Sequence, residues 1–294
     1  MTTPSYIGRF APSPSGPLHF GSLVAALASY LDAHSNQGHW LVRMEDIDPP
    51  REQQRAAAHI LKTLEAYGLQ WHGSVLFQSE RSGAYQTILD KLLTKRQLYP
   101  CTCTRKKLAG TNGIYPGYCR NNTVLPNEPF SLRLKCPDET FAFNDSIQGF
   151  TSFGTGILDD FILKRKDGLF AYQLAVCVDD EFQKITHIVR GFDLIDSTPR
   201  QLHLQNVLGY QHPIYSHIPV ISLSDGNKLS KQNHAPAIPL DEPRPLLVKA
   251  MKALAMIPPA DLVSSSLDDI IQWGIRHWDM NRIPSTSEIP LKSL

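Results

Sequence analysis

The sequence predicts an α/β fold built on a Rossmann-like parallel sheet, and three observations support that prediction. Short apolar runs typical of strands alternate, in the first hundred residues, with stretches whose apolar residues recur every three or four positions, as in helices. The order strand, helix, strand, helix indicates a parallel sheet with crossover helices. A chain of 294 residues is long enough for one large domain with an insertion, or for two domains.

The expected elements follow one another along the chain. Strands are predicted over 6–10 and 39–44, and amphipathic helices over 20–32, 51–67 and 82–96. Residues 130–135 are strand-like, 159–164 and 172–178 are strand-like or short helical pieces, and 185–190 is a buried-strand candidate. A helix is expected over 197–208, where Pro199 lies in the first turn and is therefore tolerated. Two further helices, 245–256 and 267–278, precede a tail rich in Pro and Ser.

These elements divide the chain into four expected parts. Residues 1–98 form the first half of the α/β domain, 99–165 a metal-bearing insertion, 166–235 the second half, and 236–294 a small helical C-terminal portion. The insertion is inferred from a change of character: a cysteine cluster, several Asn, Pro and Gly turns, and short strand-like runs.

Composition indicates an ordinary soluble protein, with 42% apolar and 19% charged residues. The N-terminus has no signal-peptide pattern, and the longest apolar stretch, 23–31, is too short to span a membrane. We therefore expect a cytoplasmic protein without a membrane partner, and a monomer by default.

A net charge of +1 gives no overall nucleic-acid signal. Any RNA contact would come from a local basic patch, which a solvated surface explains equally well: Lys91, Lys95, Arg96, Arg105, Lys106 and Lys107.

Three of the five cysteines cluster, as Cys101, Cys103 and Cys119. An odd count with this spacing favours a zinc site over disulfides, although three unliganded thiols remain the alternative. Structural zinc takes four tetrahedral ligands. The fourth ligand is not obvious, because no histidine lies between His72 and His187; Tyr115 is the preferred candidate and Tyr118 the second. Cys136 and Cys177 are interpreted as ordinary buried thiols.

A turn rich in Pro and Gly, residues 9–22 (RFAPSPSGPLHFGS), leads from the first strand into the first helix. Pro12 fixes backbone angles, and Gly16 permits a tight turn. The exposed N–H groups at the start of the helix favour an anion such as phosphate. His19 is then placed to donate to the triphosphate of ATP, and Gly21 leaves room for adenine or ribose. A proline-rich turn that merely caps a core helix is the alternative.

A lysine pair, Lys228 and Lys231, brackets Leu229-Ser230 just after the turn residues Asp225-Gly226. On a loop, Lys231 is able to reach a phosphate and stabilise charge that develops only in the transition state. The alternative interpretation is that residues 228–231 form a solvated surface loop.

Taken together, residues 9–22, Arg43-Met44-Glu45-Asp46-Ile47-Asp48 and the lysine pair resemble the HIGH and KMSK regions of class I aminoacyl-tRNA synthetases, specifically the glutamyl branch. A second block over 159–199 is also similar, so the resemblance covers roughly 5–235. Ser22 at the fourth HIGH position and Leu229 for Met are mild departures.

The resemblance implies a site for glutamate and a site for Mg²⁺ and ATP. It assigns His19, Lys228 and Lys231 to catalysis. The implied glutamate pocket is Arg9, Ala11, Ser13, Glu45, Tyr172 and Arg190, with Glu45 on the ammonium and the arginines on carboxylate oxygens. The implied ATP site is Pro12, Gly16, His19, Gly21, Ser22 and Lys231. The resemblance also favours Tyr115 as the fourth zinc ligand.

One departure concerns the substrate. Val176 stands where these synthetases usually carry Asn, which removes one substrate hydrogen bond. Glutamine therefore remains a competing substrate, although two arginines argue against a neutral amide. An ion pair between Arg9 and Glu45 across adjacent strands would be a purely structural alternative for those two residues.

Full glutamyl-tRNA synthetases continue into an anticodon-binding region, which we expect to be absent from a chain of 294 residues. The resemblance is therefore closest to the short paralogues, the glutamyl-queuosine tRNA(Asp) synthetases. These activate glutamate without tRNA and transfer it to queuosine in the anticodon of tRNA(Asp). The alternatives are a minimal synthetase that charges a tRNA 3′ end, transfer to a small amine or hydroxyl, and a non-catalytic RNA-binding paralogue.

Overall fold

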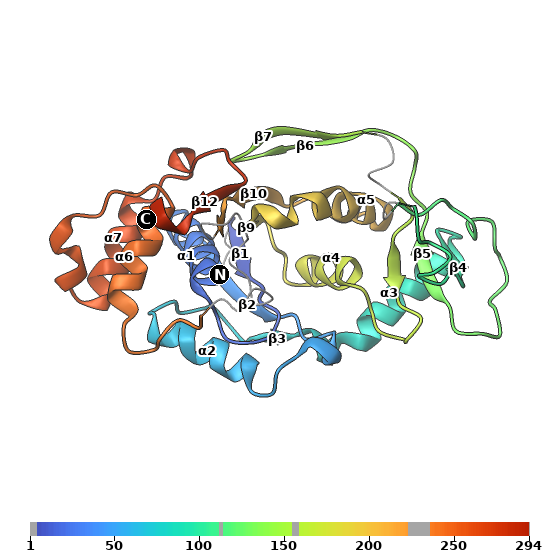
Figure 1. Ribbon diagram of the computed structural model, residues 1–294, viewed down its shortest axis with the longest axis horizontal. Coiled ribbons are helices and arrows are strands. Elements are labelled where there is room, and N and C mark those ends of the chain that lie inside the picture. The colour runs from blue at the N-terminus through green and yellow to red at the C-terminus, as the bar shows by residue number, and fades with distance from the viewer. Residues whose placement is uncertain (1–4, 112–113, 155–158, 223–235, 294) are drawn as a thin grey trace.

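The structure is a computed structural model that describes residues 5–111, 114–154, 159–222 and 236–293 (Figure 1). Its centre is a parallel sheet, which confirms the predicted α/β class. Strand β1 (Ile7–Phe10) pairs with β2 (His39–Met44), and β2 pairs with β3 (Leu76–Phe77). Strand β9 (His187–Gly191) pairs with β10 (Ile214–Ile218). The N–H of Thr186 donates to the carbonyl of Ile7 at 2.9 Å, so β9 lies beside β1 and completes the order β3-β2-β1-β9-β10.

Helices cover this sheet on both sides. Helix α1 (Phe20–Ser35) lies to its left in Figure 1, and α4 (Tyr172–Phe182) and α5 (Thr198–Leu208) lie to its right. The other two helices of this part are α2 (Ala56–Ala66) and α3 (Ser82–Thr94). Segment 172–178, left open between strand and helix, is thus the first part of a helix. Single 3-10 turns occupy Pro49–Arg51, Gln78–Arg81, Phe192–Ser197, Ala260–Ser264, Met280–Arg282 and Leu291–Ser293.

The predicted helix over 51–67 is wrong at its N-terminal end. Helix α2 begins only at Ala56, because Arg55 adopts a left-handed conformation with φ of 66°. Just before it, the N–H of Gln53 donates to the carbonyl of Pro14 at 3.0 Å. This contact ties the segment to the proline-rich turn, so it cannot continue the helical hydrogen bonding.

The segment between the two halves of the sheet contains two separate β structures. Strands β4 (Leu98–Cys101), β5 (Ser131–Leu134) and β8 (Ile162–Lys164) form an antiparallel sheet next to the cysteine cluster. Strands β6 (Phe141–Asp145) and β7 (Gly149–Phe153) form a hairpin. The hairpin runs back over α5 toward β10, and the Ser146 N–H donates to the Tyr215 carbonyl at 2.9 Å (Figure 1).

The C-terminal portion packs on α1. Helices α6 (Pro243–Ala253) and α7 (Leu267–His277) lie beside it at the left end of Figure 1. A Cβ added at Gly274 would lie 2.7 Å from Met251 Cε, so glycine permits this close helix packing. The tail after α7 is more ordered than the Pro and Ser content indicates. Its residues Glu288–Pro290 form β12, which pairs in parallel with β11 (Val220–Ser222).

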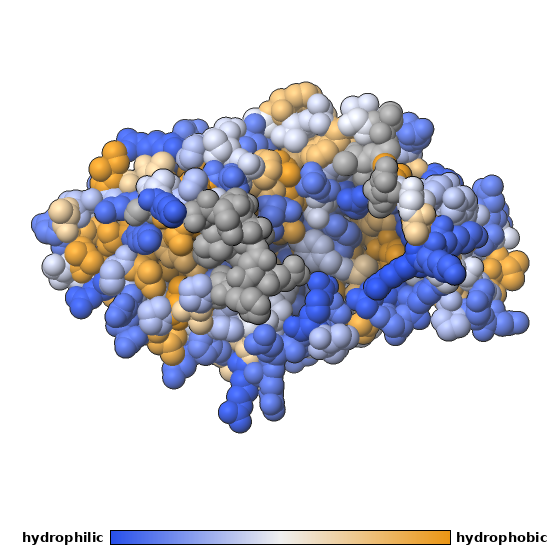
Figure 2. Space-filling view, in the orientation of Figure 1, coloured by the Kyte–Doolittle hydropathy of each residue, from blue (hydrophilic) through white to orange (hydrophobic). Residues whose placement is uncertain are grey.

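The larger apolar core lies between α1, strands β1 and β2, and the C-terminal helices, and a second core lies among α3, α4 and strands β4, β5 and β8. In the described parts of the chain, no helix combines the length and the apolar character needed to cross a bilayer. Figure 2 shows hydrophilic residues over most of one face, with apolar residues mixed among them at the end formed by α6 and α7.

Candidate active site

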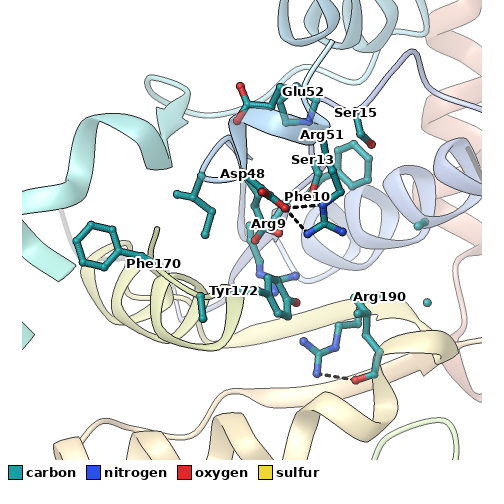
Figure 3. A pocket seen from close by; sticks show the side chains of 18 of the residues that line it. Arg9, Phe10, Ser13, Ser15, Asp48, Arg51, Glu52, Phe170, Tyr172 and Arg190 are labelled. Carbon is teal, nitrogen blue, oxygen red and sulfur yellow. Dashed lines mark hydrogen bonds and ion pairs between the residues drawn. The ribbon is translucent and has the colours of Figure 1, made fainter. Parts of the chain in front are cut away.

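A cavity of about 800 Å³ opens where strands β1, β2 and β9 end at their carboxyl edge. This edge is where parallel α/β sheets bind ligands. Arg9 lies in β1, Arg190 lies in β9, and Tyr172 begins α4 (Figure 3). Glu45 directly follows β2. The sheet thus gathers at one cavity the whole predicted glutamate set: Arg9, Ala11, Ser13, Glu45, Tyr172 and Arg190.

Behind this cavity, Asp180 of α4 orients Arg9. Its Oδ1 atom accepts from Arg9 Nε at 3.3 Å and from Arg43 Nη2 at 2.7 Å. Burial alone would raise the pKa of Asp180, but the two guanidinium groups outweigh it and lower that pKa. Asp180 is therefore an anion at neutral pH, and its single oxygen fixes both arginines. An Arg9–Glu45 ion pair is not among the described contacts; Glu45 faces Arg43 instead, at 3.7 Å.

The Glu45 carboxyl group lies in an environment that disfavours its ionised form. Its side chain is 8% exposed. Burial raises its pKa to about 7, even though Arg43 and Arg9 act in the opposite direction. A cation entering the cavity would supply the missing charge, because an opposite charge nearby favours the ionised carboxylate. The site is thus suited to an ammonium group at Glu45.

Arg190 is held firmly by the protein. Its Nε donates to His217 Nε2 at 2.9 Å, and its Nη1 donates to Gln201 Oε1 at 2.8 Å. The Nη2 atom donates to Thr198 Oγ1 at 2.8 Å and to the Leu194 carbonyl at 3.3 Å. These contacts use four of the five N–H groups of a guanidinium. Arg190 is therefore a fixed cation in the wall, with less capacity for bidentate binding than Arg9.

Tyr172 and Val176 lie on the same helix but in different surroundings. Tyr172 lines the cavity, and burial together with the nearby Glu45 carboxylate raises its pKa, so the phenol keeps its proton. Val176 is fully buried in the second core. At position 176 the valine therefore serves packing. Gln201, whose Nε2 donates to Gln173 Oε1 at 3.0 Å, is one of the polar side chains near Tyr172.

A second cavity, of about 380 Å³, adjoins the first and shares Phe10, Ser13, Ser15, Ala25 and Gly191 with it. Of the predicted ATP residues it is lined by Pro12, His19, Gly21 and Ser22. Gly16 lines neither cavity; its φ of +145° shows that it serves the turn. The two cavities meet over Ser13 and Ser15, so ligands bound in each would lie next to one another.

His19 caps helix α1 and faces the second cavity. Its Nδ1 accepts a hydrogen bond from the Ser22 N–H at 3.2 Å. A neutral imidazole that accepts at Nδ1 carries its proton at Nε2. His19 therefore presents an N–H donor at the helix end where an anion is favoured.

Lys228 and Lys231 lie outside the described residues. The chain directly before 223–235 is β11, whose Ile221 lines the second cavity. The chain directly after it returns to the same cavity, because Ala237 bridges to His19 and the Ile238 N–H donates to the Leu18 carbonyl at 3.0 Å.

Both cavities also have lining residues outside the predicted site set, although two of them, Ile47 and Asp48, belong to the motif string 43–48. The outer wall of the first cavity adds Ile47, Asp48, Arg51, Glu52, Arg165 and Phe170. Asp48 pairs with Arg51 and, at 3.2 Å, with Arg165 (Figure 3). Asp48 could be suspected because it follows β2, whereas Arg165 and Phe170 lie after a different sheet. In the second cavity, Asp193 was missed; it follows the end of β9, where a polar residue is itself a signal.

The cysteine cluster forms a compact site at β4, toward the right end of Figure 1, and its cysteines line neither cavity. The sulfur atoms of Cys101, Cys103 and Cys119 lie within 4.8 Å of one another, an arrangement able to hold a metal ion. The Tyr115 hydroxyl lies 3.4 Å from Cys101 Sγ and 3.9 Å from Cys103 Sγ. Tyr115 is 6% exposed, whereas Tyr118 is 56% exposed. Three sulfurs and one phenol oxygen thus face a common point, and this donor set fits a thiolate-rich structural site.

The predicted basic patch is exposed throughout, both at the end of α3 and in the turn after Cys103: Lys91, Lys95, Arg96, Arg105, Lys106 and Lys107. Lys107 lies over the ring of Tyr118 at 5.2 Å. Cys136 and Cys177 are buried, as expected for ordinary thiols.

The family model for class I tRNA synthetases (E and Q), catalytic domain, matches residues 7–242. A Pseudomonas fluorescens protein described as glutamyl-Q tRNA(Asp) synthetase is 51% identical over 290 residues, covering 98% of this chain and 97% of that protein. A Pseudomonas aeruginosa protein of the same description is 50% identical over 293 residues, covering 99% of this chain and 100% of that protein.

Solved structures show the same fold. A glutamate tRNA ligase from Elizabethkingia meningosepticum in complex with its amino acid superposes with a TM-score of 0.80 at 27% identity, covering 97% of this chain and 67% of that chain. The glutamate-tRNA synthetase from Elizabethkingia anophelis gives a TM-score of 0.81 at 27% identity, covering 97% of this chain and 68% of that chain.

Proposed function

This chain belongs to the family of class I tRNA synthetases for glutamate and glutamine, and from that membership we propose that it activates L-glutamate with ATP, without tRNA, and transfers the glutamyl group to queuosine in the anticodon of tRNA(Asp). It is a ligase. The observation that carries the proposal is the identity of about half the residues over the full length of two proteins described as glutamyl-Q tRNA(Asp) synthetases. The proposed tRNA substrate places the reaction in the cytoplasm.

The first cavity takes glutamate in this proposal. The side-chain carboxylate lies at Arg9 and Arg190, the ammonium at Glu45, and Tyr172 orients the substrate. The reacting α-carboxylate then faces the second cavity across Ser13 and Ser15, which line both. Two cationic groups select a charged carboxylate over the neutral amide of glutamine.

The second cavity takes ATP with its Mg²⁺. His19 donates its Nε2–H to the triphosphate, Gly21 permits close approach to the nucleoside, and Asp193 accepts from the ribose hydroxyls. Lys228 and Lys231, on the segment flanked by residues of this cavity, supply positive charge to the phosphates in the transition state.

In the reaction, an oxygen of the α-carboxylate attacks the α-phosphorus of ATP. The bond to pyrophosphate breaks, and a mixed anhydride forms. A hydroxyl of the acceptor then attacks the carbonyl carbon of the anhydride and releases AMP. This reaction needs no covalent enzyme intermediate, so positioning and electrostatic stabilisation supply the catalysis.

Zinc, bound by Cys101, Cys103, Cys119 and Tyr115, is proposed as a structural ion. Its place next to β4 suggests that it fixes the fold of the segment around the antiparallel sheet. The exposed basic patch on the same segment and on α3 is the proposed contact with tRNA phosphates.

The first test is glutamate-dependent exchange between ATP and pyrophosphate without tRNA, run beside glutamine, aspartate and a Lys231→Ala variant. Exchange with glutamate alone, lost in the variant, is expected. Labelled glutamate is then transferred to tRNA, and the labelled nucleotide is mapped after nuclease digestion. A label at the anticodon wobble base supports the proposal. A label at the 3′ end would identify a minimal synthetase, and the absence of exchange under all conditions would overturn the proposed activity.

A further inference from the structure

The tip of the β6–β7 hairpin reaches the back of the glutamate cavity. The Gln148 Nε2 atom donates to the His217 carbonyl at 2.8 Å, which holds the tip against β10. Asp145, the last residue of β6, has a fully buried side chain. A residue from the middle segment of the chain therefore lies within the second half of the sheet.

Asp145 is fully engaged by hydrogen-bond donors. Its Oδ1 accepts from the N–H groups of Ile147 at 3.0 Å, Gln148 at 2.9 Å and His217 at 3.1 Å. Its Oδ2 contacts His217 Nδ1 at 2.6 Å. Burial would raise the pKa of Asp145, but these hydrogen bonds outweigh it and lower that pKa. The carboxylate is thus ionised and acts only as an acceptor.

His217 lies between Asp145 and Arg190, and its tautomer follows from its neighbours. Arginine has no acceptor, so His217 Nε2, 2.9 Å from Arg190 Nε, accepts that N–H. Nδ1 therefore carries the ring proton and donates it to Asp145. Burial, together with the Arg190 guanidinium, lowers the pKa of His217 despite the opposing effect of Asp145, in agreement with a neutral ring.

We propose that Asp145 and His217 are positioning residues for substrate binding, because Asp145 fixes the tautomer through which His217 orients the Arg190 guanidinium in the glutamate cavity. This inference depends on the proposed role of Arg190 in holding a glutamate carboxylate. Neither residue lines the cavity, so both act through Arg190.

The Asp145→Asn variant tests the proposal most directly. An amide placed so that it donates to His217 Nδ1 would force the proton onto Nε2, where it meets the Arg190 Nε–H donor. We expect the KM for glutamate to rise about 10- to 100-fold, which corresponds to about 1.4 to 2.7 kcal/mol. The KM for ATP is expected to change less than about twofold, since His217 and Asp145 lie outside the second cavity.

Variants at His217 provide the matched comparison. In the His217→Gln variant, the amide oxygen of the new side chain takes the place of Nε2 and remains an acceptor for Arg190. This variant is therefore expected to retain most of the affinity for glutamate. His217→Leu removes the acceptor and is expected to raise the KM for glutamate as Asp145→Asn does. Equal losses in the Gln and Leu variants would overturn the proposal.

Gln148→Ala separates hairpin docking from the chain of hydrogen bonds. It removes a tip contact but leaves Asp145, His217 and Arg190 in place, so the KM for glutamate should stay within about twofold. If Gln148→Ala raised the KM for glutamate as much as Asp145→Asn does, docking of the β6–β7 hairpin alone would explain the effect, and the proposal would fail.

A measurement on the intact protein that needs no activity is the ¹⁵N spectrum of its histidines, with His217 assigned by the His217→Gln variant. We expect Nδ1 protonated and Nε2 unprotonated, and the reverse tautomer would overturn the inference. If unaltered protein shows no glutamate-dependent exchange, the proposed function fails. If it is active and Asp145→Asn leaves the KM for glutamate unchanged, the inference about Asp145 and His217 fails by itself.

Discussion

The Nδ1 atom of His19 accepts the backbone N–H of Ser22 at 3.2 Å across the first turn of helix α1. This one hydrogen bond caps the helix and places the proton of a neutral ring on Nε2, in a residue that lines the second cavity. The same side chain therefore contributes to stability and, in the proposed reaction, to phosphate binding.

Variants at His19 separate those two contributions. His19→Ala is expected to lower stability by about 1 kcal/mol, the usual cost of losing an N-cap, and to slow glutamate-dependent exchange by about 100-fold. His19→Asn keeps a side-chain cap but does not reach the phosphates, so it should be as stable as the unaltered protein and still slow. Urea unfolding and exchange assays measure the two effects; an Asn variant with full activity would contradict the phosphate role.

Glu45 predicts an unusual dependence of stability on pH. Its pKa is raised to about 7 in the folded protein, against 4.5 for an ordinary glutamate. As the pH rises from about 4.5 to 7, the unfolded chain loses this proton and the folded chain keeps it, so the free energy of unfolding falls by up to about 3 kcal/mol. Glu45→Gln removes that loss. The variant should thus be more stable than the unaltered protein at pH 8 and equal to it near pH 4, as measured by urea unfolding.

The same carboxylate predicts how glutamate binding responds to pH. Below about pH 7 the free protein protonates Glu45, which then no longer attracts an ammonium group. We expect the KM for glutamate to rise as the pH falls from 8 to 6, and we expect this slope to disappear in Glu45→Gln, which should bind weakly at every pH. A slope that persists in the variant would assign the titration to another group.

Asp180 is predicted to be a stability hot spot as well as a support for Arg9. Removing it by Asp180→Ala leaves two buried guanidinium groups without their shared anion, which should cost about 3 to 5 kcal/mol. Asp90→Ala is the control, because the carboxylate of this exposed residue accepts only from Gln86 in the described contacts, and its loss should change stability by less than about 0.5 kcal/mol. Comparable losses for the two variants, measured by chemical denaturation, would refute the assignment.

The cysteine cluster predicts zinc near one ion per chain in protein purified without added metal. Cys103→Ser should lower the zinc content and the Tm together, since metal binding contributes folding energy. Tyr115→Phe should weaken retention of zinc against a chelator, and Tyr118→Phe should not, because only Tyr115 is buried beside the sulfurs. Metal analysis after dialysis against chelator measures this, and equal retention in both tyrosine variants would exclude Tyr115 as a ligand.

Local patterns in the amino-acid sequence predicted much of the fold. Strand β2 has the predicted limits, and helix α3 begins at the predicted residue, because their apolar spacing and flanking turns are local signals. The start of α2 was wrong because a contact between Gln53 and Pro14 decides it, and those residues lie 39 positions apart. The β12 strand was missed because its three residues lie in a tail rich in Pro and Ser, and their strand partner, β11, is distant in the sequence.

The sequence likewise revealed some residues of the candidate site and missed others. Residues on the motif strings, such as Arg9 and Glu45, were found because a known family carries them at matching positions. Asp145 was not found: 72 residues separate it from His217, and nothing around Asp145 in the sequence distinguishes it from a surface turn residue. Lys228 and Lys231 stay predictions, since the described residues reach only as far as the chain on either side of them.

The pairing of β11 with β12 has a consequence for synthesis of the protein. Val220 pairs with Glu288, so β11 emerges from the ribosome 68 residues before its partner. At about 5 to 20 residues per second, this strand has an open edge for roughly 3 to 14 s. Such an edge is a template for wrong pairing. The wall of the second cavity that contains Ile221 thus acquires its strand partner late, and a nascent chain paused in this interval is exposed to aggregation at that edge.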